Sequence, residues 1–159
     1  MVILGIDPAL TVTGYGVIQT GAKVSLVEAG VIATSAKEKL AGRLNKIYRA
    51  ISKLIIDTKP DVVVLEKLYA HYRHPTTAYL LGQARGVIVL ACATQNVALV
   101  EYAATRVKKA IVGKGLASKH QVQRMVAATL QISRVPKYTD VTDALALAIA
   151  HNHIMRVRL

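Results

Sequence analysis

Residues 2–20 read VILGIDPALTVTGYGVIQT, and this stretch decides how the fold begins. Residues 2–6 form a short apolar run that is typical of a buried strand. Residues 13–20 and 23–33 follow as two more strands, which pair as a hairpin around residues 19–21. The chain therefore opens with an antiparallel meander, and Asp7 stands directly after its first strand.

Strands and helices alternate after this opening. Ser35 and Glu38 have the spacing of a capping box, which predicts a helix from there to about Asp57, closed by Pro60. The later patterns predict a buried strand over 61–65, an irregular segment over 67–76, a helix over 77–95, a strand over 97–100 and helices over 118–130 and 139–155. These elements predict an α/β fold with a mixed five-stranded sheet flanked by helices.

The size of the chain fits a single domain over residues 1–159. A chain of 159 residues with 53% hydrophobic content can build one core without disulfides. Cys92 is the only cysteine, so no disulfide can form within the chain, which favours a reducing compartment. Because Cys92 lies in an apolar run, we interpret it as a small buried hydrophobe.

Neither a signal peptide nor a membrane span is expected. No basic residue precedes Lys23, and Asp7 interrupts the first apolar stretch. The longest stretch without charge, residues 86–100, is shorter than the roughly 20 apolar residues that a spanning helix needs. We expect a cytoplasmic protein without a membrane partner.

Positive charge is concentrated in the second half of the chain. The formal net charge is +12, from 21 Lys and Arg against 9 Asp and Glu. No acidic residue lies between Tyr102 and Thr139, a stretch with eight Lys and Arg that include Lys108 and Lys119. Such a stretch favours a partner dense in phosphate, although a merely solvated basic face would have the same composition.

The scarce acidic residues indicate the chemistry. Asp7 and Glu66 each follow a buried strand, so neighbouring strands would bring both carboxylates to one edge of the sheet. Asp140 and Asp143 are three residues apart at the start of the last helix and share one face. Helix capping would explain the second pair but not the first.

Four converging carboxylates repel one another unless cations lie between them. Oxygen ligands of this kind suit Mg²⁺ or Mn²⁺, and two such ions can activate a water and stabilise a leaving oxygen in phosphodiester cleavage. An acidic cluster in basic surroundings therefore predicts a metal-dependent nuclease.

Other candidate site residues give weaker signals. Glu101 also follows an apolar run, but a structural pairing with Arg or Lys is the favoured interpretation. The histidine pairs His71 with His74 and His151 with His153 lack thiol partners for zinc. The glycines near residues 14 and 113 match neither a dinucleotide fingerprint nor a phosphate-binding P-loop.

The helix predicted over 77–95 is apolar on every side from Gly86 to Ala93. Such a helix has to be covered all round, either by its own domain or by another subunit. Gly82, Ala84 and Gly86 would allow a second helix to approach closely. Two interpretations stay open, an ordinary core helix and the seam of a two-fold dimer.

Several motifs in order resemble one known family. Gly5-Ile6-Asp7-Pro8, Thr13-Gly14-Tyr15-Gly16, the strand ending at Glu66, residues 81–86 (LGQARG) and Asp140-x-x-Asp143-Ala144-Leu145-Ala146 are similar to the RuvC family of Holliday-junction resolvases. The resemblance spans nearly the whole chain. It differs at Ala9, where the family usually has glycine, and at Tyr69, where the aromatic residue is often Phe.

The resemblance implies an RNase H-like fold and a homodimer that makes paired nicks across a four-way DNA junction in recombination and repair. It implies Mg²⁺ or Mn²⁺, two ions at each site, and action with the branch-migration proteins RuvA and RuvB. It assigns the metal-binding catalytic quartet to Asp7, Glu66, Asp140 and Asp143, with no catalytic counterpart for Glu101. It also assigns DNA contacts to Lys108, Lys119 and Tyr69.

Three alternatives compete with this prediction. The opening motif also resembles actin-like ATPases and sugar kinases, but those proteins need two related domains. A non-catalytic nucleic-acid-binding module would not need four acidic residues in these positions. An RNA-processing nuclease of the same fold stays open at this point.

Overall fold

The computed structural model describes residues 1–68, 75–133 and 136–157. It contains a five-stranded sheet with the order β3-β2-β1-β4-β5. The strands are β1 (Val2–Asp7), β2 (Val12–Gln19), β3 (Ser25–Ala33), β4 (Val62–Glu66) and β5 (Ala98–Tyr102). β1 to β3 form the predicted antiparallel meander, whereas β4 and β5 run parallel to β1. The predicted mixed sheet is confirmed.

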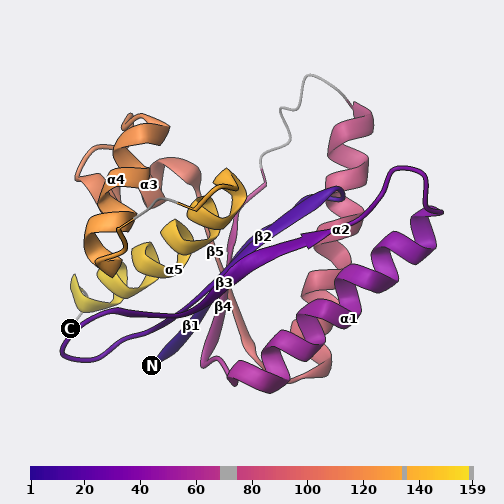
Figure 1. The fold of residues 1–159 in the computed structure, drawn as a ribbon, viewed down its shortest axis with the longest axis horizontal. Helices are drawn as coiled ribbons and strands as arrows, with labels where there is room; N and C mark the ends of the chain where they lie inside the picture. Colours follow the sequence, from indigo (N-terminus) through magenta and orange to yellow (C-terminus); the bar gives the residue numbers. More distant parts are fainter. Residues whose placement is uncertain (69–74, 134–135, 158–159) are drawn as a thin grey trace.

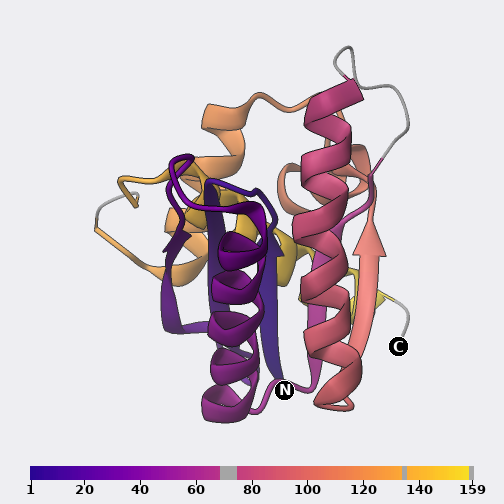
Figure 2. The ribbon, with the colours of Figure 1, turned by 90° about the vertical axis from the view of Figure 1, so that its right-hand side faces the viewer.

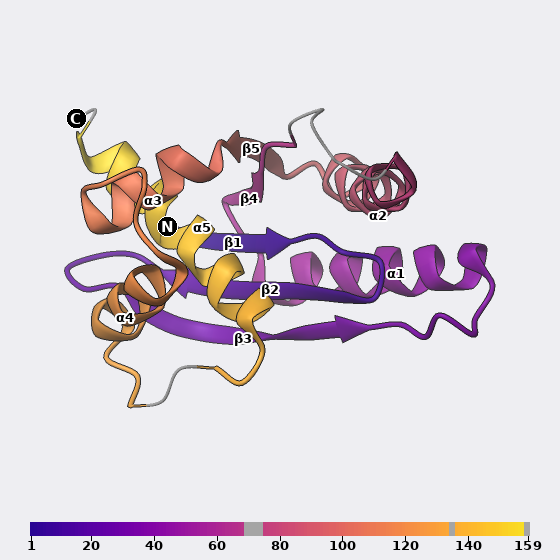
Figure 3. The same cartoon turned by 90° about the horizontal axis from the view of Figure 1, so that it is seen from above.

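Five helices cover the two faces of this sheet. α1 (Leu40–Thr58) and α2 (Pro75–Thr94) lie side by side on one face, as Figure 2 shows. α3 (Ala104–Val112), α4 (Lys119–Leu130) and α5 (Thr139–Val157) lie on the other face (Figure 1). Seen from above, α5 crosses β1 and β2, so the start of α5 comes close to the centre of the sheet (Figure 3).

The alternation of side chains along β1 and β4 explains the two layers. Ile3 and Val64 face α3, α4 and α5, whereas Leu4 and Val63 face α1 and α2. Because successive strand residues point to opposite faces, an unbroken apolar strand supplies a core on both sides. This is why the two central strands carry no polar residue before their last position.

The capping box predicted at Ser35 and Glu38 is wrong. α1 begins at Leu40, and its N-cap residue Lys39 makes no side-chain capping bond. Ser35 closes a turn instead, where its carbonyl accepts a hydrogen bond of 3.0 Å from the Glu38 N–H. The capping box of the chain lies on α4, where the Ser118 hydroxyl accepts from the Gln121 N–H and the Gln121 side chain accepts from the Ser118 N–H.

α2 is covered by its own chain on one side only. Ile88 and Ala91 are fully buried, but Val89 and Leu90 are 39% and 53% exposed. The interpretation of α2 as an ordinary core helix is therefore wrong for the described chain. By length and composition, the segment Thr76–Thr94 is the one described helix that could cross a membrane, with a mean hydropathy of 1.2.

Charge divides between the two helical layers. Glu38, Asp57 and Asp61 lie on or beside α1, where they are mixed with Lys and Arg. The segment with α3 and α4 carries positive charge alone, because no acid lies between Tyr102 and Thr139. The two faces of the sheet thus present different electrostatic surfaces.

Candidate active site

Asp7 and Glu66 are brought to one edge of the sheet, as predicted. They are the last residues of β1 and β4, two parallel neighbours that pair Ile6 with Leu65. The carboxyl ends of parallel strands are where α/β sheets bind their ligands.

Glycines bring the start of α5 to the same edge. Gly14 pairs with Asp7 in the β1–β2 ladder, and a Cβ atom at Gly14 would overlap the carbonyl oxygen of Asp140. A Cβ atom at Gly5 would likewise overlap the carbonyl oxygen of Ala144. The backbone of α5 therefore rests directly on the strands, and Asp140 is held beside the end of β1.

The four carboxylates interact electrostatically. The pKa of Asp7 is raised to about 7, first because the carboxyl is buried and then because Asp143, Asp140 and Glu66 repel its negative charge. The pKa of Glu66 is also raised, again chiefly by burial, with a further contribution from Asp143. Asp7 thus responds to all three other members of the quartet, which the structure brings together.

Two lysines border this cluster. The Lys119 ammonium lies 2.7 Å from a carboxylate oxygen of Asp143, and Lys108 lowers the pKa of Glu66. Both lysines line a pocket of about 270 Å³ together with Glu66 and Asp143. The pocket therefore combines acidic and cationic groups, a composition that suits a phosphodiester bound beside metal ions.

The donor set fits a divalent cation. All four side chains offer hard carboxylate oxygens, and a cation would relieve the repulsion that raises the pKa of Asp7. The Lys119 ammonium already places one positive charge on Asp143. Within the described residues, no three acidic, imidazole or thiol groups are close enough to enclose an ion in this arrangement, so metal binding would require the carboxylates to converge further.

Glu101 has the structural role that the sequence favoured. It pairs with Arg85, and the same guanidinium donates to the carbonyl oxygen of Glu66 at 2.8 Å. Glu101 thereby orients the Arg85 guanidinium, which holds the end of β4 through the Glu66 carbonyl. Tyr69, His71 and His74 lie outside the described residues.

His151, His153 and Cys92 have structural contacts or burial. His151 is hydrogen bonded to the Tyr102 hydroxyl at 2.9 Å, and His153 to the carbonyl of Ala110 at 2.9 Å. Cys92 is buried, which raises its pKa to about 11. That thiol is therefore not a nucleophile at neutral pH.

The loop after Asp7 is held by hydrogen bonds from Thr13 and Arg43 that the sequence did not predict. The Thr13 hydroxyl donates to the Ala9 carbonyl at 2.6 Å and accepts from the Ala9 N–H at 3.3 Å. The buried Arg43 guanidinium donates to the carbonyl of Leu10 and to the hydroxyl of Thr34. These bonds hold the loop with Ala9 in place of the usual glycine. The sequence signal for Arg43 is that a basic residue occupies a position of α1 that lies with its buried apolar residues.

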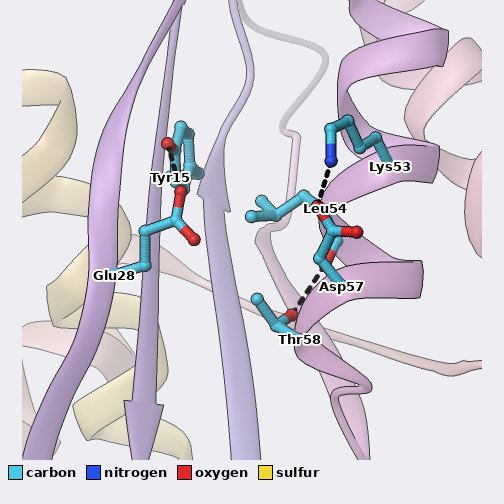
Figure 4. Close-up of polar contacts among 6 residues, drawn as sticks. All are labelled: Tyr15, Glu28, Lys53, Leu54, Asp57 and Thr58. Atoms are coloured by element: carbon cyan, nitrogen blue, oxygen red, sulfur yellow. Dashed lines mark hydrogen bonds and ion pairs between the residues drawn. The ribbon is translucent and has the colours of Figure 1, made fainter.

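A larger hollow, of about 500 Å³, lies away from these carboxylates between β3 and α1. Its two acidic residues already have partners. Glu28 accepts a hydrogen bond of 2.9 Å from Tyr15, and Asp57 pairs with Lys53 (Figure 4). In the described chain, acidic side chains therefore cluster at the edge of the sheet formed by β1, β4 and α5, and not in this hollow.

A mixed sheet of this order, with carboxylates at the ends of its central strands and on the helix that crosses them, defines an RNase H-like nuclease. Residues 3–151 match the family described as crossover junction endodeoxyribonuclease RuvC. The chain belongs to this family, whose nuclease activity depends on divalent metal ions.

Individual relatives agree over the whole length. The crossover junction endodeoxyribonuclease RuvC of Alkaliphilus oremlandii is 43% identical over 96% of this chain and 93% of its own. The structure of Thermus thermophilus RuvC has a TM-score of 0.91 at 32% identity, covering 99% of this chain and 97% of that one. The T. thermophilus RuvC complex with a Holliday junction substrate also has a TM-score of 0.91, at 29% identity, with 99% and 96% coverage.

Proposed function

We propose that residues 1–159 act as one nuclease domain that resolves four-way DNA junctions by paired symmetric nicks. The observation that carries this proposal is that Asp7 and Glu66 end two paired parallel strands while the backbone of Asp140 rests on Gly14, the strand partner of Asp7, in a chain of net charge +12. Membership of the RuvC family supplies the substrate class. The reaction belongs to DNA recombination and repair.

The quartet would hold Mg²⁺ or Mn²⁺, two ions at each site. Asp7, Glu66, Asp140 and Asp143 would supply the carboxylate oxygens that hold these ions, since Asp7 interacts electrostatically with the other three. Bound ions would supply an activated water and charge stabilisation for the leaving oxygen.

The basic side chains position the DNA. Lys119 lies against Asp143 and can turn its ammonium toward a backbone phosphate when a metal ion neutralises that carboxylate. Lys108 lies in the same pocket beside Glu66 and provides a second phosphate contact. Tyr69, on the segment after Glu66, would stack on an unpaired base near the crossover.

The working unit in this proposal is a homodimer in the cytoplasm that acts with RuvA and RuvB. A four-way junction has approximate two-fold symmetry, so two identical sites can make the two nicks. The proposal includes no membrane partner.

Cleavage of three substrates in parallel tests the proposal. The unmodified protein and Asp7→Asn are incubated with Mg²⁺ and a four-way junction, a linear duplex of the same sequence or a structured RNA. We expect the unmodified protein to cut only the junction, at paired positions in strands of like polarity, and the variant to cut nothing. Preferred cutting of RNA would favour the RNA-processing alternative, and cutting by Asp7→Asn would exclude the proposed site.

A further inference from the structure

A second basic hollow lies away from the acidic cluster. Its volume is about 390 Å³, and it lies between α3 and the C-terminal part of α5. Its lining consists of Arg106, Lys109, Ala110, His153, Ile154 and Val157. Asp140 and Asp143 are at the opposite end of α5, so this hollow is separate from the proposed catalytic pocket.

Arg106 and His153 are each positioned by a contact within the chain. The Arg106 guanidinium lies 5.1 Å from the centre of the Tyr102 ring. The His153 ring is tied to α3 by the hydrogen bond between its Nδ1 and the carbonyl of Ala110. Because each side chain is partly ordered before any ligand arrives, less conformational freedom is lost on binding.

No acidic group balances this charge. Among the ion pairs of the described residues, none involves Arg106, Lys109 or His153. The nearest acids along the chain are Glu101, which pairs with Arg85, and Asp143, which pairs with Lys119. An unbalanced cluster of basic groups around a hollow is suited to bind an anion.

α3 separates this hollow from the catalytic pocket. Arg106 and Lys109 are three residues apart and share one side of the helix, whereas Lys108 lines the pocket that contains Glu66. One short helix therefore offers basic groups to two depressions. A four-way junction has arms that leave the crossover in several directions, so the two depressions can serve different parts of the DNA.

We propose that the hollow between α3 and α5 binds a backbone phosphate of a junction arm at some distance from the crossover. This inference rests on the proposed function, because it takes four-way DNA as the substrate. Arg106 and Lys109 supply the charge, and Ala110, Ile154 and Val157 form the apolar walls against the sugar edge.

The test measures how junction binding depends on salt in EDTA, where no cleavage occurs. Lys109→Ala and Arg106→Ala/Lys109→Ala are compared with the unmodified protein on junctions with long and with short arms. Lys46→Ala and Lys46→Ala/Arg49→Ala on α1, across the sheet, are the matched controls. Circular dichroism verifies that each variant is folded.

On long arms, we expect the slope of log affinity against log salt to fall by about 0.9 for the double variant, since one phosphate contact contributes about that much. Lys109→Ala alone should lower the slope by part of this amount, because Arg106 still faces the same phosphate. The controls should keep the slope of the unmodified protein. On short arms, all variants should match the unmodified protein.

An unchanged slope on long arms would overturn the inference, and so would an equal loss on short arms, which would place the contact at the crossover. Cleavage by the unmodified protein, measured alongside in Mg²⁺, separates the two proposals. Normal junction cleavage with unchanged slopes refutes only the hollow, whereas absence of junction cleavage refutes the proposed function.

Discussion

Asp7 is the residue on which the proposed chemistry depends most. Its carboxyl interacts with all three other members of the quartet, so its loss would remove one of the carboxylates that hold the metal ions. We expect Asp7→Asn to lower the rate of junction cleavage by at least about 10³-fold, to below detection in a standard assay. Junction affinity in EDTA should stay the same or rise, because one negative charge near the phosphates is removed. A folded variant that loses affinity and cleavage together would contradict this prediction.

The same carboxyl makes the stability of the metal-free protein depend on pH. The pKa of Asp7 is raised from 3.8 to about 7, so the folded chain holds a proton that the unfolded chain releases. Protonation of Asp7 therefore adds stability that is complete below about pH 4 and is lost as the pH rises through about 7.

Thermal unfolding in EDTA measures this contribution. Between pH 6 and pH 8, the Tm of the unmodified protein should fall relative to that of Asp7→Asn, which cannot titrate at this position. A loss of about 1 kcal/mol corresponds to about 2–4 °C for a domain of this size. Parallel Tm curves for the two proteins across this range would refute the raised pKa.

Individual residues differed in how well the sequence revealed their roles. The common edge of Asp7 and Glu66 was predictable because acids are scarce in this chain and these two stand at the ends of apolar strands. Gly14 and Arg43 were not predictable as parts of the site, since their roles depend on contacts with α5 and with the loop after Asp7. The partner of Glu101 was predictable as a basic residue but not as Arg85, because that pairing connects two separate elements.

At the scale of elements, the packing of α5 on β1 and β2 determines the geometry of the site. A methyl group at Gly14 would overlap the backbone of Asp140, so Gly14→Ala has to displace the start of α5. We expect this change to reduce cleavage by at least about tenfold and to cost about 1–3 kcal/mol of stability, as overpacking commonly does. Junction binding should persist, because α3 and α4 keep their basic residues.

Gly42→Ala is the matched control for this variant. Gly42 lies on α1, where an added Cβ would meet no atom within 4 Å. Alanine in an exposed helix is favoured over glycine by up to about 1 kcal/mol, so this variant should be slightly more stable and fully active. Full activity of Gly14→Ala would show that close packing of α5 is not required for catalysis.

α3 and α4 each contribute one lysine, Lys108 and Lys119, to the pocket that contains Glu66 and Asp143. If Lys108 and Lys119 both meet backbone phosphates, Lys108→Ala and Lys119→Ala should each lower the slope of log affinity against log salt by about 0.9. The measurement is a salt titration of junction binding in EDTA, with Lys46→Ala on α1 as the control. Unchanged slopes in both variants would assign the phosphate contacts to other basic residues.

The elements themselves were predictable where one signal dominates. Apolar runs predicted β1, β4 and β5, because strands covered on both faces require apolar side chains on both, and the hairpin pattern predicted β2 and β3. The start of α1 was misplaced, because the spacing of Ser35 and Glu38 is equally compatible with an isolated turn. Residue type alone does not decide whether a serine caps a helix or closes a turn.

At the scale of the whole molecule, we expect a second copy of the chain to cover the exposed apolar side of α2. Val89 and Leu90 are 39% and 53% exposed in the described chain, and a self-complementary apolar face is what a two-fold interface requires. Light scattering should therefore report about 34 kDa, twice the chain mass of 17.1 kDa.

Val89→Asp and Leu90→Asp should both give folded monomers, because an unpaired charge in a buried seam is strongly unfavourable. Ile56→Asp is the matched control, since Ile56 is 56% exposed on α1 and has no expected partner. A monomeric unmodified protein that still makes paired nicks at micromolar concentration would exclude both the seam and the symmetry argument.

The division of charge between the two helical layers gives the molecule an electric dipole. DNA produces a strong negative potential, which exerts a torque on such a dipole and turns the α3 and α4 side forward before any contact is made. Fewer encounters then begin with the α1 side, so a larger share of collisions is productive. The arrangement of 21 basic residues therefore contributes to the speed of junction capture as well as to its affinity.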